Sequence, residues 1–157
     1  QMCIRDRGEP LEISGPNGRW FTWNPASTSP VQLIGGGSGI VPLMSMIRKR
    51  EVAAPSTPFN LVYSLRGPER RYFAAELDQL AAHDRLPISV FHTRVAQQDD
   101  VRMPGRVTAA ELAAVTIAPE REPVVYICGP NGFVEYCART MLHVGHPADR
   151  IRTERFG

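Results

Sequence analysis

The chain has 157 residues, of which 43% are hydrophobic and 22% are charged, as in an ordinary globular protein. This length accommodates one compact domain together with a short additional segment. The formal net charge of +2 is too small to indicate a nucleic acid or an acidic membrane surface as the partner.

The cysteine and histidine positions indicate neither a disulfide framework nor a metal site. Cys3, Cys128 and Cys137 are odd in number, lack C-x-x-C spacing and are too few for a plant-type iron–sulfur cluster. His143 and His146 flank a helix end, where a solvated pair is favoured over a metal site. The apolar runs are far shorter than the roughly 20 residues of a membrane span, and the first seven residues lack a signal-peptide core. We therefore expect a soluble, cytoplasmic protein without a membrane span.

The predicted elements begin after a linker at 24–30, which is rich in proline, serine and threonine. From there, short apolar runs with β-branched and aromatic residues alternate with helical patterns. The runs predict five strands at Val31–Ile34, Leu61–Ser64, Ile88–His92, Val124–Cys128 and Ile151–Phe156.

Apolar residues at helical spacing lie between these strands and predict helices that cover the sheet. They form three stripes: Ile40, Leu43, Met44 and Ile47; then Phe73, Leu77 and Leu80; then Val134, Cys137, Ala138 and Met141.

Helix-capping signals agree with this pattern. Thr108 and Glu111 have the spacing of a capping box. Asn131 is expected to cap the following helix, and Gly145 is expected to end it.

Strands separated by helices of this length require right-handed crossovers and a parallel sheet covered on both faces. We therefore predict an α/β fold with a doubly wound, five-stranded parallel sheet in the order 3-2-1-4-5. Ligands of such sheets bind outside the carboxyl ends of the strands.

The glycine turn at 35–39 carries the strongest chemical signal. Glycines allow a close backbone approach to an anion, and the following helix offers N–H groups and the positive end of its dipole. Ile40 stands where G-x-G-x-x-G would have its third glycine, and no Gly-Lys-Ser/Thr follows, so ordinary Rossmann and P-loop sites are disfavoured. The alternative is a turn that only packs tightly.

Polar residues and a small turn follow the other strands, and all should line one crevice. Ser64 and Arg66 stand where a fold selecting NAD would place an acid for the ribose hydroxyls, which favours the 2′-phosphate of NADP. Thr93 and Arg94 follow the third predicted strand, and Arg106 lies further along. The alternative for the arginines at 66, 70 and 71 is solvation of a helix start.

Four motifs together resemble the nucleotide-binding half of the ferredoxin–NADP+ reductase family of flavoproteins, over residues 9–157. They are Gly-Gly-Gly-Ser-Gly-Ile-Val-Pro at 35–42, Tyr-Ser-Leu-Arg at 63–66 followed by Glu76-Leu77, Ile-Cys-Gly-Pro-Asn-Gly-Phe at 127–133, and Glu-Arg-Phe-Gly at 154–157.

The resemblance implies a role for each matching residue. The pyrophosphate and nicotinamide side would be held by Gly36, Gly37, Ser38 and Gly39, with Pro42 fixing the loop. The phosphate of the adenosine ribose would be bound by Ser64, Arg66, Thr93, Arg94 and Arg106. The nicotinamide would lie beside the turn of Cys128, Gly129 and Pro130, near Glu154, with Phe156 shielding the flavin. From the sequence without the resemblance, the first interpretation of Cys128 is a small buried hydrophobe at a strand end.

Members of this family carry an antiparallel flavin-binding barrel ahead of the nucleotide domain, and its flavin motifs are absent here. Residues 9–23 resemble only its closing strand and turn. We therefore expect residues 1–29 to be the barrel remnant and linker, 30–157 to be the NAD(P)-binding domain, and the chain to be part of a longer flavoenzyme.

The resemblance implies an NAD(P)H-dependent oxidoreductase that passes hydride to FAD and then electrons to a ferredoxin-like or oxygenase acceptor, with FAD held mainly by the missing domain. Cofactors carry such chemistry, so the protein would position the reacting rings. Two alternatives remain: a nucleotide-binding module without its own catalysis, and a flavodoxin-like domain whose first loop binds FMN. The sequence favours NADPH over NADH only moderately, because family members that prefer NADH also have an arginine at the position of Arg66.

Overall fold

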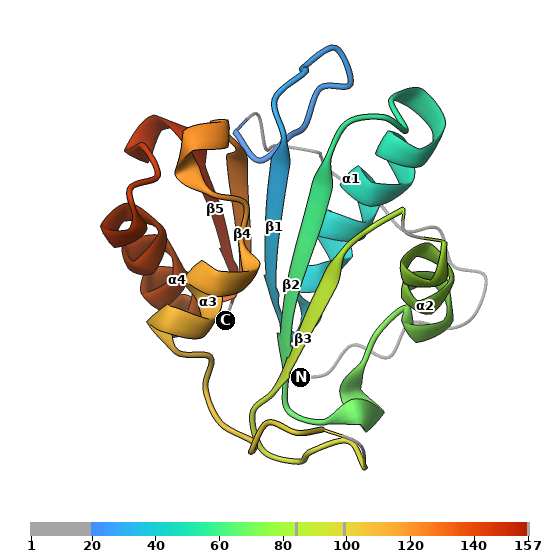
Figure 1. Cartoon of the computed structure of the whole chain (residues 1–157), viewed down its shortest axis with the longest axis vertical. Coiled ribbons are helices and arrows are strands. Elements are labelled where there is room, and N and C mark those ends of the chain that lie inside the picture. Colours follow the sequence, from blue (N-terminus) through green and yellow to red (C-terminus); the bar gives the residue numbers. More distant parts are fainter. Residues whose placement is uncertain (1–19, 84, 99, 157) are drawn as a thin grey trace, which may run out of the picture.

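The computed structural model of the chain describes residues 20–83, 85–98 and 100–156. Its parallel sheet has the strand order β3-β2-β1-β4-β5, which confirms the predicted fold and order (Figure 1). The strands are β1 (Val31–Gly36), β2 (Phe59–Leu65), β3 (Ile88–His92), β4 (Val124–Pro130) and β5 (Ile151–Phe156).

Three strands extend beyond their predicted ends. Gly35 and Gly36 close β1 rather than opening the turn, because their backbones pair with Tyr63 and Ser64 of β2. Strand pairing uses main-chain groups, so glycines at the end of a central strand can continue its hydrogen-bond ladder. The sequence does not predict this extension, because glycine has no side chain that favours a strand. The turn itself begins at Gly37, as the first residue of the 3₁₀ turn η1 (Gly37–Gly39).

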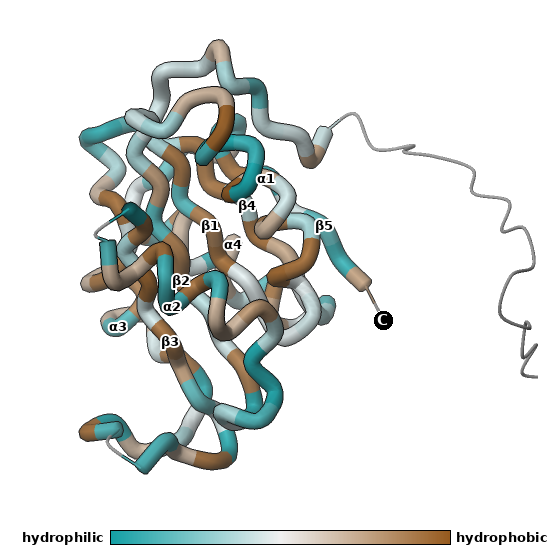
Figure 2. Tube along the Cα trace, turned by 90° about the vertical axis from the view of Figure 1, so that its right-hand side faces the viewer, coloured by the Kyte–Doolittle hydropathy of each residue, from teal (hydrophilic) through white to brown (hydrophobic). Residues whose placement is uncertain are grey.

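Helices cover both faces of the sheet. The helices α1 (Ile40–Ala53) and α2 (Ala74–Ala82) pack on the face that presents Leu33 and Leu61, whereas α3 (Ala109–Val115) and α4 (Asn131–Val144) pack on the face that presents Ile34 and Val62. Adjacent residues of a strand point to opposite faces, so continuous apolar runs feed both cores. Figure 2 shows the strongly hydrophobic stretches running along the strands.

Two of the predicted helix boundaries are confirmed. Thr108 Oγ1 accepts a hydrogen bond from the Glu111 N–H (3.2 Å), and the Glu111 carboxylate accepts one from the Thr108 N–H (2.7 Å), completing the capping box. Gly145 ends α4 in a left-handed conformation with φ of 110°.

Two other boundary predictions are wrong. Asn131 is the first residue of α4, and Pro130 takes the N-cap position, because the extended backbone of β4 runs directly into the helix. Phe73 precedes α2 with φ of 57°, so it is not part of the helix. Its ring nevertheless packs on the first core, under the guanidinium of Arg48 at 5.1 Å.

The segment before β1 packs on the same face as α1. Trp23 is only 5% exposed, because its ring meets Phe59 edge-on with centroids 5.0 Å apart. Trp20, by contrast, is 66% exposed. The Arg152 guanidinium lies between the rings of Trp20 and Tyr126. The predicted barrel residues 9–19 lie outside the described part of the chain.

Within the described ranges, no helix combines the length and the apolar character required to cross a membrane. The same residues contain no group of three or more His, Cys, Asp or Glu side chains that could hold a metal ion.

Candidate functional site

Two adjoining hollows lie at the carboxyl edge of the sheet, where the sequence places its glycine turn. The first has a volume of about 350 Å³ and is lined by Ser38, Val41, Pro42, Cys128, Glu154, Arg155 and Phe156. The second has a volume of about 260 Å³ and is lined by Gly36, Gly37, Ser38, Leu65, Arg66, Arg70, Tyr72, Pro130 and Phe156. Both hollows share Ser38 and Phe156 and so form one continuous site.

The glycines of the turn meet different steric requirements. Gly37 has φ of 55°, and a Cβ built on it would have no heavy atom within 4 Å, so its backbone faces open space. A Cβ on Gly39 would lie 2.1 Å from the Cys128 carbonyl oxygen, and one on Gly36 would lie 2.6 Å from the Phe133 ring. Gly37 therefore supplies an open left-handed turn, while Gly36 and Gly39 permit the turn to approach β4 and α4 closely.

The N-terminal end of α1 faces this turn. The first N–H groups of a helix have no partner within it, and they carry the positive end of its dipole. With η1 leading directly into α1 at Ile40, backbone donors and an open glycine lie together beside Ser38. Such a combination binds an anion.

The first hollow has a thiol at its base. Cys128 is buried and lies beside Glu154 in the sheet register, and Phe156 lies beside Pro130 in the same pairing. Burial raises the pKa of the Cys128 thiol to about 11, and the nearby Glu154 carboxylate adds to the shift. The thiol is therefore protonated at neutral pH and is not a nucleophile.

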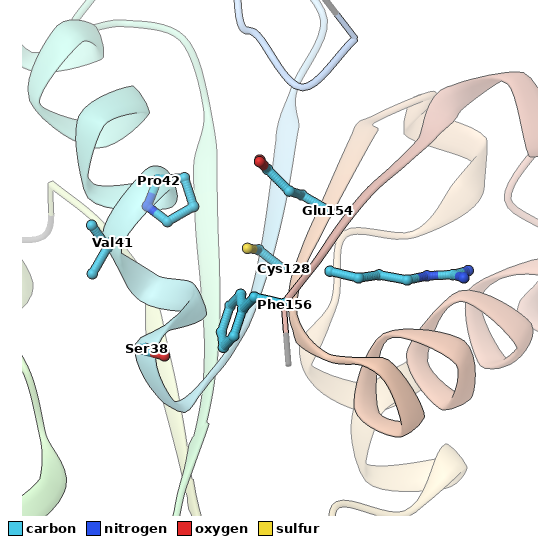
Figure 3. A pocket seen from close by; sticks show the side chains of 7 residues that line it. Ser38, Val41, Pro42, Cys128, Glu154 and Phe156 are labelled. Atoms are coloured by element: carbon cyan, nitrogen blue, oxygen red, sulfur yellow. The ribbon is translucent and has the colours of Figure 1, made fainter. Parts of the chain in front are cut away.

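Figure 3 shows how the first hollow is arranged. The Cys128 sulfur and the Phe156 ring point into the space between the end of the sheet and the start of α1, with Pro42 on the opposite side. Glu154 extends toward the same side. Phe156 is the last residue of the edge strand β5 and is 37% exposed, so its ring forms an open part of this wall.

The second hollow is positively charged. Arg66 and Arg70 line it, and the described part of its lining contains no carboxylate. Three of the predicted arginines, Arg66, Arg94 and Arg106, are exposed, and within the described residues none of their guanidinium groups has an ion pair. By contrast, Arg71 pairs with Asp78 at 2.7 Å.

The remaining predicted phosphate residues cluster behind Arg66. The Thr93 N–H donates to the Leu65 carbonyl (2.8 Å), and the Arg94 N–H donates to the Arg66 carbonyl (2.9 Å). Arg106 follows Gly105, whose N–H donates to the carbonyl oxygen at the end of β3 (3.1 Å). The backbones of these residues therefore lie at one edge of the sheet, at the ends of β2 and β3.

Not every predicted residue borders a hollow. Ser64 is buried and pairs with Gly36 inside the sheet. The described linings of both hollows leave out Ser64, Gly39, Thr93, Arg94, Arg106 and Gly129. Gly39 and Gly129 instead act through packing, because a Cβ on Gly39 would meet the Cys128 backbone and a Cβ on Gly129 would meet Phe133 and Gly36.

Five residues of the described lining lie outside the predicted site: Val41, Leu65, Arg70, Tyr72 and Arg155. For Arg70 the sequence indicates only a solvated helix start. Arg70 closes the 3₁₀ turn η2 (Pro68–Arg70), and Tyr72 follows two residues later. Both residues lie within seven positions of the end of β2, and ligands of such sheets bind at the carboxyl ends of the strands. This closeness in sequence is the feature from which their place in the site can be predicted.

Comparison with protein-family models matches residues 33–139 to the oxidoreductase NAD-binding domain. The chain belongs to this family. The match runs from within β1 into α4, and it includes the glycine turn, the arginines and the Cys128 turn. It confirms the resemblance to the nucleotide-binding half of ferredoxin reductase-like proteins.

Individual relatives agree with the family. The chain is 27% identical over 151 residues to flavohemoprotein A of Dictyostelium discoideum, covering 96% of this chain and 36% of that protein. It is 29% identical over 154 residues to the reductase component of propane 2-monooxygenase of Mycolicibacterium smegmatis, covering 95% and 43%. The chain thus spans less than half the length of either relative.

A solved structure gives the same result. The flavohem-like FAD/NAD binding domain of nitric oxide dioxygenase from Vibrio cholerae O1 biovar El Tor superposes with a TM-score of 0.75 and 28% sequence identity. The superposition covers 89% of this chain and 55% of that one. The fold and the family together establish an NAD-binding oxidoreductase domain.

Proposed function

We propose that the chain binds NADPH in preference to NADH across the two hollows and presents the nicotinamide for hydride transfer to FAD. The observation that carries this proposal is the continuity of the site: a glycine turn at a helix start lies between an arginine-lined hollow and a hollow with a protonated thiol. A dinucleotide has the matching order of adenosine phosphate, pyrophosphate and nicotinamide.

The residues present fit a dinucleotide. The open backbone of Gly37 leaves room for a pyrophosphate that a Cβ-bearing residue in this conformation would not provide. The two volumes together fall within the usual range for ligand sites of about 300–1,000 Å³. Gly36, Gly37 and Ser38 would hold the pyrophosphate, with Gly39 and Pro42 setting the position of the turn.

The charge of the second hollow supports NADPH. A site selecting NAD usually offers a carboxylate to the ribose hydroxyls. Here Arg66 and Arg70 line the hollow, with Arg94 and Arg106 on neighbouring loop backbone. Guanidinium groups bind phosphate through two parallel hydrogen bonds. Ser64 and Thr93 would support this loop from the sheet, and Tyr72 adds an exposed ring for the adenine.

The first hollow supports a positioning role at the nicotinamide end. When bound, the nicotinamide supplies a hydride, so the protein needs no nucleophile or base there. The protonated Cys128 gives a small wall, and Glu154 offers a carboxylate in the same lining. Gly129 and Pro130 would set the course of the turn that follows Cys128. Phe156 would cover the site and exclude water until the nicotinamide ring takes its place.

Two similar proteins support a proposal for the fate of the electrons. The Vibrio domain binds FAD as well as NAD, and the Mycolicibacterium relative is the reductase of an oxygenase. We infer that FAD accepts the hydride and that an iron–sulfur protein or an oxygenase receives single electrons. The division into a flavin-barrel remnant at 1–29 and a nucleotide domain at 30–157 belongs to the same proposal.

The test measures the affinities of the chain for NADPH and NADH by calorimetry. In Arg66→Ala and Arg70→Ala, the Kd for NADPH should rise about tenfold and that for NADH less than about twofold, because one phosphate contact is lost. The control is Arg121→Ala, since Arg121 ends a second Pro-Glu-Arg 3₁₀ turn, η3 (Pro119–Arg121), at the opposite edge of the sheet. Unchanged NADPH affinity in Arg66→Ala would remove that residue from the site, and absence of binding by the wild type would overturn the proposal.

A further inference from the structure

The connection between β3 and α3 carries Arg94 and Arg106, and it has an internal anchor. This connection, residues 93–108, projects beyond the carboxyl edge of the sheet (Figure 1). It contains no helix or strand within its described residues. Backbone hydrogen bonds fix its two ends, from the Arg94 N–H to the Arg66 carbonyl (2.9 Å) and from the Gly105 N–H to the His92 carbonyl (3.1 Å). The stretch between them has no regular backbone ladder, so its position depends largely on side chains.

Arg102 is the centre of the anchor. Its Nε donates to Glu111 Oε1 (2.5 Å) and one terminal nitrogen donates to Oε2 (3.2 Å), a two-pronged pair with the first turn of α3. Its guanidinium also lies 5.2 Å from the ring centroid of Phe91 in β3. The same group donates to backbone carbonyls at both ends of the loop: His92 (3.3 Å), Met103 (3.1 Å), Gly105 (3.2 Å) and Arg106 (3.0 Å).

Glu111 is held as firmly as its partner. Besides Arg102, it accepts hydrogen bonds from the N–H and the hydroxyl of Thr108, at 2.7 and 2.8 Å. These bonds lower the pKa of Glu111 to about 2, with the hydrogen bond from Arg102 as the largest cause. The carboxylate is therefore charged at all physiological pH values.

A second tie holds the middle of the loop. Asp100 Oδ2 lies 2.6 Å from Nδ1 of the buried His92, and it also accepts the Gln97 N–H at 2.8 Å. The loop is thus attached to β3 at His92 by both Arg102 and Asp100.

The anchor separates the arginines of this loop into two kinds. Arg102 uses its guanidinium entirely within the protein, while Arg94 and Arg106 are exposed and, among the described residues, have no ion pair. A charged side chain on a fixed backbone binds its ligand with a smaller loss of conformational entropy than one on a mobile loop. The anchor therefore restricts the backbone that carries the guanidinium groups of Arg94 and Arg106, and it does so without contacting the ligand.

We propose that the pair of Arg102 and Glu111 is a positioning device that sets the affinity of the site for the 2′-phosphate. The proposal rests on the function proposed above, because it assumes that Arg94 and Arg106 contribute to the phosphate site. Arg102 and Glu111 would act only through the backbone of the 93–108 connection.

The experiment measures binding of 2′,5′-ADP and 5′-AMP to the 157-residue chain by calorimetry. The two probes differ by the 2′-phosphate alone. The informative variant is Glu111→Gln, because glutamine preserves the capping box but weakens the bonds to Arg102. Removing a negative charge by itself would tighten phosphate binding, whereas releasing the loop would weaken it. The sign of the change therefore distinguishes the proposal from simple electrostatics.

Arg48→Ala is the matched control for Arg102→Ala. Arg48 also forms a two-pronged pair, with Glu76 at 2.9 and 2.7 Å, and it also lies over a phenyl ring, 5.1 Å from the centroid of Phe73. Both variants lose one positive charge, one ion pair and one ring contact, but only Arg102 holds the loop. Thermal melts of each variant establish that it is folded.

We expect Glu111→Gln and Arg102→Ala to weaken 2′,5′-ADP binding about fivefold to tenfold and 5′-AMP binding less than about twofold, with Arg48→Ala close to wild type. Tighter or unchanged 2′,5′-ADP binding in Glu111→Gln would overturn the proposal. If Arg66→Ala loses the preference for 2′,5′-ADP while both anchor variants keep it, the phosphate site stands and the anchor fails. If the wild type shows no preference for 2′,5′-ADP, the phosphate site fails and the anchor fails with it.

Discussion

At the amino edge of the sheet, the guanidinium of Arg50 is buried and donates to the carbonyl oxygens of Thr57 (2.9 Å) and Arg85 (2.8 Å). At the carboxyl edge, Arg66 lines an open hollow, and within the described residues it has no ion pair. Arg150, also at the amino edge, donates to the Glu122 carbonyl at 2.6 Å. The same residue type thus closes one edge of the sheet and leaves the other edge ready for a ligand.

The arginines of this domain are therefore of two kinds. A guanidinium that satisfies backbone carbonyls stabilises the connections where it lies, because unpaired buried carbonyls are costly. One that lacks a protein partner, at the edge where such sheets bind ligands, is available to an anion. The amino-acid composition does not distinguish these two kinds of arginine, whereas their hydrogen-bond and ion-pair partners in the structure do.

The largest effect tests whether the carboxyl edge depends on close backbone contact. Gly39→Ala places a Cβ 2.1 Å from a backbone carbonyl, so we expect a loss of at least about 3 kcal/mol in the free energy of unfolding. Gly132→Ala is the control: its Cβ would have no neighbour within 4 Å and alanine favours the helix, for a gain of up to about 1 kcal/mol. Urea unfolding measures both, and equal effects would contradict the close approach.

The next prediction compares the two edges directly. Arg50→Met leaves two carbonyls unpaired and removes an ion pair with Glu51, so it should lower the free energy of unfolding by about 2 kcal/mol. Arg66→Met should change it by less than about 0.5 kcal/mol, because Arg66 is exposed. Urea unfolding of the two variants without nucleotide is the measurement. A loss in Arg66→Met as large as that in Arg50→Met would remove the distinction between the edges.

The smallest effect concerns the thiol at the carboxyl edge. Burial holds the pKa of Cys128 at about 11, so its alkylation by iodoacetamide should stay slow at pH 7–9 and accelerate only as the pH approaches 11. Glu154→Gln should lower this pKa without bringing it to the ordinary value of 9.0, because burial is the larger cause. Mass spectrometry resolves each cysteine, with the buried Cys137, whose pKa is about 12, as the internal reference. Half-maximal alkylation of Cys128 at or below pH 9 would contradict the burial argument.

The sequence predicted the sheet well because its signal is continuous. Buried parallel strands appear as apolar runs such as Val124–Cys128, and the order of the strands follows from the doubly wound connections. The glycine turn was recognisable because Gly37 and Gly39 have no ordinary substitute. The placement of predicted residues at one edge of the sheet followed from the same rule.

Residues whose position depends on a neighbour in space were harder to predict. Trp23 is buried by Phe59, which lies 36 positions away, and Phe73 reaches the core from outside its helix. Asn131 has a capping side chain, but the backbone of β4 enters α4 one residue earlier. Arg70 and Tyr72 have no periodic signal, because they lie in a connection whose course the sequence pattern does not specify.

The Phe156 ring belongs to the walls of both hollows, as does Ser38. A ligand that fills one hollow and shifts this ring would change the boundary of the other, which would link the two ends of the site thermodynamically. Suppose that an adenosine mononucleotide changes the affinity of the site for nicotinamide mononucleotide by some factor. Nicotinamide mononucleotide must then change the affinity for the adenosine mononucleotide by the same factor. Half-ligands of a dinucleotide would therefore report a coupling free energy through a single aromatic side chain.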